Sequence, residues 1–201
     1  MRIAMIGDSI TYDGGDTNQE SWLHIVRQHF NGSVELMNFG VNGATAMKQS
    51  DKSYWDMPEY QQALNAQADA YIIMLGTNDS KKHNWPGSPA TYKIDLLNLT
   101  NSFKNLPHRP SVFLVLPAPV TSSEFAIDGK VIAEQIVPAV AHASTLTGLQ
   151  LLDFHTPFNN DSKYFYDGIH PNQTGREKFA ALLIQTIEQK IFVNSSSAPA
   201  K

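Results

Sequence analysis

The sequence predicts one α/β domain in which helices cover both faces of a five-stranded parallel sheet. Two observations support this fold class. Short apolar runs bounded by turn residues alternate along the chain with longer segments of helical period. In addition, a chain of 201 residues, of which 42% are hydrophobic and 17% charged, is typical of one globular domain with a substantial core.

The short apolar runs are the predicted strands, and turn residues follow each of them. Five strands suit a chain of this length. In order, they are Ile3–Ile6, Val34–Asn38, Ala70–Leu75, Val112–Leu116 and Leu149–Asp153.

The longer segments predict helices near Ser21–Phe30, Glu59–Gln67, Ala90–Asn105, Lys130–Thr147 and Gly175–Lys190. Pro138 interrupts the fourth of these segments and should kink or divide it. The polar tail from Asn194 lacks any period and is expected to fray, so the predicted domain covers residues 1–193. The last helix has the clearest pattern, an apolar stripe made of Phe179, Leu182, Leu183 and Ile187.

Composition excludes several classes of function. A formal charge of −4 and the lack of a Lys/Arg cluster argue against nucleic-acid binding. Without cysteine there can be no disulfide, thiolate metal site or cysteine nucleophile. No export signal and no run of about 18 apolar residues is present, which predicts a cytoplasmic protein that does not enter a membrane.

Polar residues follow four of the five predicted strands. In an open parallel sheet the ligand crevice lies beyond the carboxyl ends of the strands, so these residues should converge on one place. They occupy positions 7–11, 39–45 and 76–79, and a loop containing 167–171.

Ser9, His170 and Asp167 are the parts of a nucleophilic site. A serine hydroxyl needs an adjacent base, and the base works best when a carboxylate fixes its tautomer. The Asp-x-x-His spacing lets one short loop place Asp167 and His170 together, while Pro171 favours an extended backbone at His170. Taken singly, these residues are better explained without catalysis: Ser9 as a cap or turn residue, Asp167 as a turn former and His170 as a surface histidine. Their joint placement carries the prediction.

Hydrolysis of an ester also needs hydrogen-bond donors for the oxyanion that develops during attack. The sequence offers three of them at strand ends: the backbone N–H of Ser9, the backbone at Gly43 and the side-chain amide of Asn78. Either Gly43 or Asn78 alone would be read as an ordinary turn residue.

The four polar blocks, taken in order, resemble those of the SGNH, or GDSL-type, hydrolase superfamily. The resemblance rests on Gly7-Asp8-Ser9-Ile10-Thr11, Asn38-x-Gly40-x-x-Gly43, Gly76-x-Asn78-Asp79 and Asp167-x-x-His170. It implies a flavodoxin-like three-layer α/β/α sandwich, a Ser9–His170–Asp167 triad and an oxyanion hole of Ser9, Gly43 and Asn78. Such an enzyme needs no cofactor and no metal. Asp8 is expected to hold the turn at Ser9, and Asp79 to tether a loop.

The substrate is expected to be a small ester, with an O-acetyl group on a sugar as the favoured case. Stretches around Gly43–Tyr60 and Gly76–Lys81 resemble SGNH carbohydrate O-acetylesterases. Tyr12, Trp55 and Trp85 adjoin the polar blocks and could stack on a sugar, or could equally roof the core. Lipolytic esterases, lysophospholipases and thioesterases of the same superfamily remain alternatives.

Three rival readings lie outside this class. A flavodoxin-like nucleotide or flavin binder would share the architecture, but Asp8 in its phosphate loop would repel the ligand. A metallohydrolase would need scattered residues as ligands, among them Asp8, Asp13, Asp16, Asp79 and His170. A non-catalytic sugar-binding module would bind an acetylated sugar without releasing acetate.

Overall fold

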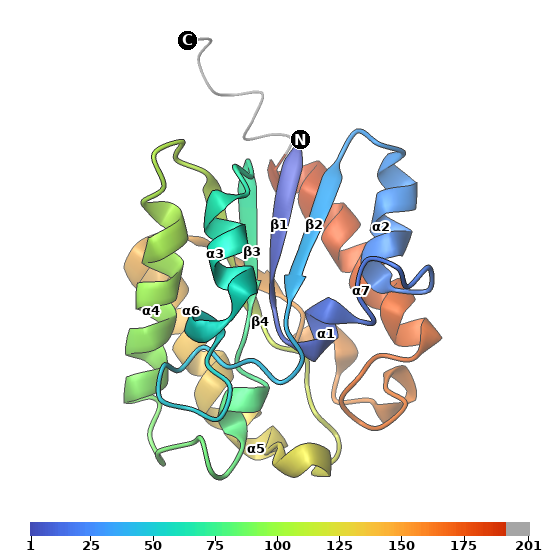
Figure 1. Ribbon diagram of the computed structural model, residues 1–201. Coiled ribbons are helices and arrows are strands. Elements are labelled where there is room, and N and C mark those ends of the chain that lie inside the picture. Colours follow the sequence, from blue (N-terminus) through green and yellow to red (C-terminus); the bar gives the residue numbers. More distant parts are fainter. Residues whose placement is uncertain (192–201) are drawn as a thin grey trace.

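A computed structural model of the chain describes residues 1–191. Five parallel strands form one sheet in the order β2-β1-β3-β4-β5 (Figure 1). The five predicted strands are confirmed, with ends that differ by at most two residues. They are β1 Arg2–Gly7, β2 Glu35–Gly40, β3 Ala70–Met74, β4 Ser111–Leu116 and β5 Gln150–Asp153.

Helices cover both faces of the sheet, which confirms the three-layer sandwich (Figure 1). Helices α3 (Pro58–Asn65), α4 (Ala90–Lys104) and α6 (Val137–Thr147) pack on one face. Helices α2 (Trp22–Phe30) and α7 (Gln173–Thr186) pack on the other. All five correspond to predicted helical segments.

Side chains of the central strand alternate between two hydrophobic cores. On β1, Ala4 and Ile6 belong to the core beneath α3, α4 and α6, while Ile3 and Met5 belong to the core beneath α2 and α7. This is the two-residue period of a strand that is buried on both faces. All four neighbouring strand pairs are parallel, with Gly7 at the end of β1 opposite Gly40 at the end of β2, so the carboxyl ends of the strands meet at one edge.

Pro138 divides the fourth helical segment, as predicted. A short helix α5 (Gly129–Val131) leads into a π-helical turn at Ile132–Ile136, and α6 begins immediately before Pro138. Proline has no N–H to continue an i→i−4 ladder, which accounts for the change of helix type at this point.

Two features at the ends of the chain qualify the predicted boundaries. The last predicted helix ends as α7 at Thr186 and continues as a π-helical turn at Ile187–Ile191. The tail predicted from Asn194 lies outside the described residues. Within residues 1–191, no helix has both the length and the apolar character needed to span a membrane.

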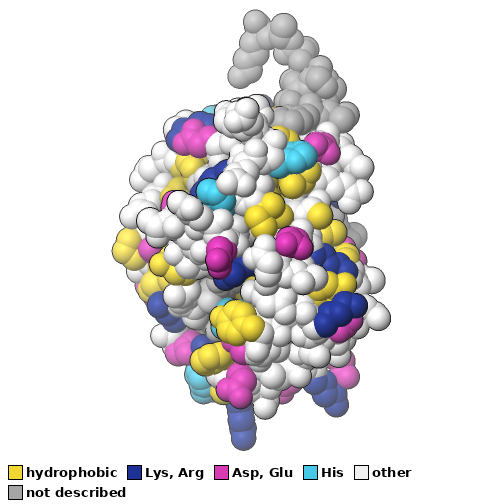
Figure 2. Space-filling view, turned by 90° about the vertical axis from the view of Figure 1, so that its right-hand side faces the viewer, with side chains coloured by type: hydrophobic (Ala, Val, Ile, Leu, Met, Phe, Trp, Pro, Cys, Tyr) yellow, Lys and Arg dark blue, Asp and Glu magenta, His cyan; other side chains and the backbone are white. Residues whose placement is uncertain are grey.

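Charged groups are interspersed on the face that carries α2 and α7. Figure 2 shows Lys and Arg side chains scattered among acidic ones there, with hydrophobic side chains in small separate groups. A polyanion would need a gathered basic surface, and this face offers none.

Candidate active site

The nucleophile candidate Ser9 stands at a sharp turn from β1 into the short helix α1 (Ser9–Tyr12). Asp8 caps this helix, because its carboxylate accepts the Ile10 N–H at 2.9 Å. The helix lies so close to the strand ends that a Cβ at Gly40 would be 2.4 Å from the backbone nitrogen of Tyr12. Glycine at that position therefore lets the serine turn sit directly over the sheet edge.

A continuous chain of hydrogen bonds links the three predicted catalytic residues. Ser9 Oγ lies 2.9 Å from His170 Nε2, and His170 Nδ1 lies 2.6 Å from Asp167 Oδ2. With Asp167 ionised, Nδ1–H is the donor to the carboxylate, and Nε2 is free to accept the serine proton. The arrangement can therefore move a proton from Ser9 to His170.

The loop of Asp167 and His170 is fixed largely by its own hydrogen bonds. Asp167 Oδ1 accepts the N–H groups of Ile169 and His170 at 2.9 and 2.7 Å. Gly168 has φ +81° and completes the bend. Partial burial acts to raise the pKa of Asp167, but the His170 ring and these two N–H donors outweigh it, so the pKa lies below its ordinary value.

The three oxyanion donor candidates lie around the same cleft as Ser9. Gly43 has φ +81°, and within residues 1–191 neither its N–H nor that of Ser9 has a hydrogen-bond acceptor. Asn78 begins a 3-10 turn after β3, and its side-chain nitrogen lies 3.4 Å from Asp8 Oδ2. Ser9, Gly43, Asn78 and His170 all line a cleft of about 540 Å³.

Two buried aspartates support this arrangement from behind. Asp79 accepts the N–H groups of Ala46 and Met47 at 3.0 and 2.9 Å, and so fixes the segment that follows Gly43. Burial raises the pKa of Asp79 to about 7, and the nearby Asp8 charge adds to this effect. Burial likewise raises the pKa of Asp8 to about 6, against the opposing hydrogen bonds of Ile10 and Thr77 and the charge of His170.

The structure separates the three aromatic residues that the sequence suggested for substrate binding. Tyr12 lines the cleft. Trp55 and Trp85 do not line it and instead pack against the core beneath α3, α4 and α6. The indole N–H of Trp55 donates to the backbone oxygen of Ala46 at 3.0 Å, as expected for a side chain that covers the core rather than the cleft.

Sequence reasoning missed two other aromatic residues that lie beside His170. The ring centroids of Phe125 and Tyr166 are 5.9 and 5.8 Å from that of His170. Tyr166 directly precedes Asp167 and could have been found from that position. Phe125 lies in a long loop after β4, where the sequence has none of the four polar blocks.

Charged residues complete the wall of the cleft, and most of them are paired. Arg176 of α7 forms a bidentate ion pair with Asp13, whose side chain is almost fully buried. Lys81 lies 3.5 Å from Asp51. The cleft is therefore polar without a strong excess of one charge.

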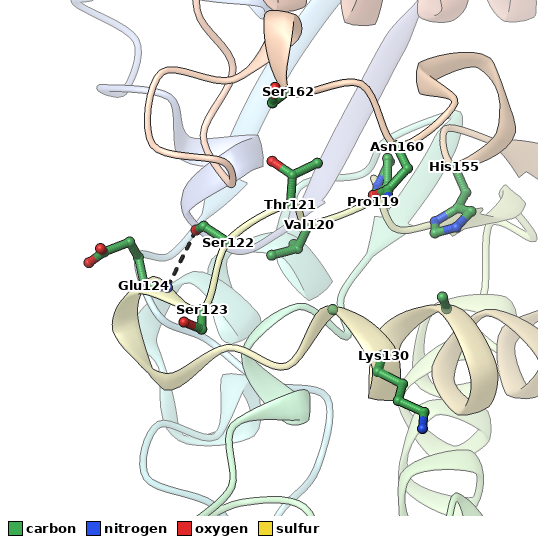
Figure 3. A pocket seen from close by; sticks show the side chains of 12 residues that line it. Pro119, Val120, Thr121, Ser122, Ser123, Glu124, Lys130, His155, Asn160 and Ser162 are labelled. Atoms are coloured by element: carbon green, nitrogen blue, oxygen red, sulfur yellow. Dashed lines mark hydrogen bonds between the residues drawn. The ribbon is translucent and has the colours of Figure 1, made fainter.

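A larger hollow, of about 1030 Å³, lies between the loop after β4 and the loop after β5 (Figure 3). His155, Asn160 and Ser162 line one side of it, and Ser122 and Ser123 the other. It contains none of Ser9, Asp167 and His170, so volume alone would point away from the reactive groups.

The residues considered as metal ligands are engaged separately. Asp13 binds Arg176, Asp16 binds Arg27, and Asp79 binds backbone N–H groups. No three His, Asp or Glu side chains in the described part of the chain gather where they could hold one metal ion.

Comparison with known proteins agrees with this geometry. The model of the GDSL-like lipase/acylhydrolase family matches residues 5–178. An acetylxylan esterase of Xylanibacter ruminicola is 28% identical over 208 residues, which cover 94% of this chain and 43% of that protein. The chain thus spans less than half the length of this relative.

Solved structures share the fold at low sequence identity. An acetyl xylan esterase, AlAXEase, superposes with a TM-score of 0.76 at 14% identity, over 93% of this chain and 100% of that one. A lipase/acylhydrolase from Enterococcus faecalis has a TM-score of 0.76 at 20% identity, over 93% and 95% of the two chains. Since the family match covers all four strand-end blocks and the fold agrees, this protein belongs to the GDSL-like lipase/acylhydrolase family.

Proposed function

We propose that this protein is a serine esterase that removes O-acetyl groups from carbohydrates. The observation that carries the proposal is the unbroken chain Asp167–His170–Ser9, with hydrogen bonds of 2.6 and 2.9 Å, beside unpaired backbone N–H donors. The names of the relatives, acetylxylan esterase among them, support the acetyl group and the sugar.

In the proposed reaction, Ser9 Oγ attacks the ester carbonyl carbon while His170 Nε2 takes the hydroxyl proton. The oxyanion is held by the N–H groups of Ser9 and Gly43 and by the Asn78 amide. His170 then gives its proton to the leaving alcohol oxygen, which leaves an acetyl group on Ser9. His170 then takes a proton from water, whose oxygen attacks the acetyl carbonyl carbon. As the bond from that carbon to Ser9 Oγ breaks, His170 returns the proton to Oγ, and acetate leaves.

Asp167 stabilises the protonated His170 and does not itself take the proton. Its lowered pKa keeps the carboxylate ionised in the conditions where the histidine must act as a base. Asp13 and Arg176 neutralise each other in the cleft wall, which suits an uncharged, hydroxylated substrate.

Replacement of the nucleophile tests the proposal. Ser9→Ala should lower kcat for p-nitrophenyl acetate by at least about 10³-fold, since oxyanion binding alone leaves only weak catalysis. The melting temperature should change little, because within residues 1–191 the Ser9 side chain hydrogen-bonds only to His170. Near-normal turnover by this variant would exclude Ser9 as the nucleophile.

The acyl group can be tested separately with p-nitrophenyl esters of rising chain length, beside acetylated sugars. We expect the highest kcat/KM for acetyl esters and release of acetate from the sugars. A preference for acyl chains beyond about eight carbons would instead favour a lipolytic esterase of the same family. Binding of acetylated sugars without acetate release would favour a binding module.

A further inference from the structure

Exposed aromatic side chains are concentrated at the reactive histidine. Five large hydrophobic side chains are exposed in the described part of the chain, and three of them, Tyr12, Phe125 and Tyr166, line the Ser9 cleft. Phe125 is 62% exposed and meets the His170 ring edge to face, while Tyr166 is 67% exposed and lies nearly parallel to it. The cleft thus presents two aromatic surfaces to solvent, one on each of two separate loops.

The exposure of Phe125 does not come from a loose loop, because the chain is anchored on both sides of it. Before it, the Thr121 N–H donates to the backbone carbonyl oxygen of Gly168 at 2.9 Å, and Ser122 Oγ donates to the backbone carbonyl oxygen of Asp167 at 2.8 Å. After it, Ile127 is buried, and the Asp128 N–H donates to Ser80 Oγ at 3.0 Å. The fold therefore holds the phenyl ring over the cleft.

The backbone at this point is also strained. Phe125 and Ala126 have φ values of +55° and +59°, in the left-handed region that disfavours residues with a Cβ. A bulky, exposed side chain in this conformation contributes little to folding. Backbone strain of this kind is found mainly at functional sites, and here the strained conformation places the Phe125 ring beside His170.

The chemistry of the proposed reaction says which part of the ester meets these rings. The carbonyl oxygen lies toward Gly43 and Asn78, whereas the leaving oxygen must lie near His170 Nε2, which returns the proton to it. The alcohol portion therefore extends along His170, between Phe125 and Tyr166. The acyl portion faces the opposite side of the cleft.

We propose that Phe125 and Tyr166 form a subsite for the alcohol portion of the ester, which takes a ring-shaped polyhydroxy alcohol such as a pyranose. This inference rests on the proposed esterase function. A pyranose has apolar faces that pack on aromatic rings, and a polar rim that suits the Asn42 and Lys81 side chains of the same cleft. A small acyclic alcohol gains nothing from the two rings.

Two acetyl esters with different alcohols test the subsite: a methyl xylopyranoside carrying one O-acetyl group, and ethyl acetate. Acetate release is measured for the wild-type protein, Phe125→Leu and Tyr166→Leu, with Ile94→Ala as a control at an exposed apolar residue of α4 outside the cleft. We expect each leucine variant to lower the ratio of kcat/KM, pyranoside over ethyl acetate, by about tenfold, mainly through KM. Ile94→Ala should leave the ratio unchanged.

Equal losses on both esters, carried by kcat, would overturn the inference, since the rings would then only position His170. An unchanged ratio in both variants would overturn it as well. If the wild-type protein hydrolyses neither ester, the proposed esterase function fails first. If ethyl acetate is hydrolysed in a way that depends on Ser9, but neither Phe125→Leu nor Tyr166→Leu changes the kcat/KM ratio, the subsite is rejected and the esterase function stands.

Discussion

Asp79 connects two parts of the oxyanion site through its position and its hydrogen bonds. It directly follows Asn78 in the chain, and its two oxygens bind the N–H groups of Ala46 and Met47, three and four residues after Gly43. The Asp79 carboxyl group therefore fixes the segment that follows Gly43 to the turn that carries Asn78, so it links two of the three oxyanion donors. This role matches the expected tether, and it gives the carboxyl group two hydrogen bonds at a position where burial raises its pKa to about 7.

The raised pKa of Asp79 predicts how stability changes with pH. A carboxyl group whose folded pKa lies above its unfolded one holds its proton more tightly when folded, so its contribution falls as pH rises from about 4 to about 7. Asp79→Asn removes this titration. The change in the free energy of unfolding between about pH 5 and about pH 8, measured by urea denaturation, should then shift by roughly 1–3 kcal/mol toward greater relative stability at the higher pH.

Asp56→Asn, at an exposed aspartate, is the matched control and should retain the wild-type pH dependence. An Asp79→Asn protein with the same pH dependence as the wild type would show that Asp79 does not titrate in this range. The same variant should also lower kcat, because the segment after Gly43 loses one of its two acceptors.

At the residue level, the sequence predicted the groups that have fixed chemistry but missed those that act by shape. Ser9, Asp167 and His170 were identifiable because acyl transfer restricts these positions to few residue types and each follows a strand. Phe125 was not, since its importance depends on a strained backbone and on a neighbour 45 positions away in the chain. Trp55 and Trp85 were near the motifs in sequence, yet the fold directs them to the core.

At the level of elements, α1 depends on how closely it approaches β2. A Cβ added to Gly40 would lie 2.4 Å from the Tyr12 nitrogen, and backbone cannot yield as a flexible side chain can. We expect Gly40→Ala to lower the free energy of unfolding by roughly 2 kcal/mol and, by displacing Ser9, to lower kcat at least about tenfold. Urea denaturation and turnover of p-nitrophenyl acetate measure the two effects.

Gly32→Ala is the control for this substitution. Gly32 has φ +85° and no atom within 4 Å of an added Cβ, so strain alone should cost about 1 kcal/mol, with kcat unchanged. If Gly40→Ala also kept its full kcat, the position of Ser9 would not depend on the contact of α1 with β2.

The strands and longer helices were predictable because each repeats an apolar pattern over several residues, as α7 does with Phe179 and Leu183. Helix α1 was not, because four residues are too few to show a period. The π-helical turn before Pro138 was predictable only as an interruption: proline forbids the regular ladder but does not specify what replaces it.

The strand order of the whole sheet could not be derived from local patterns, because it depends on which face each connecting helix crosses. The observed order places β1 between β2 and β3, and the alternation of its side chains gives both cores a share of this strand. Ile3 and Met5 cannot lose their packing without disturbing Ala4 and Ile6. The two helical layers should therefore unfold together.

The three tryptophans can test this cooperativity, because they divide between the two cores. Trp22, the first residue of α2, is fully buried in the core between the sheet and α2 and α7, whereas Trp55 and Trp85 pack on the opposite side of the sheet. In a Trp55→Phe/Trp85→Phe variant, the fluorescence of Trp22 should change at the same urea concentration as the far-UV circular dichroism, and the same should hold for the remaining pair in Trp22→Phe. Separate midpoints within either protein would show that one helical layer leaves the sheet before the other.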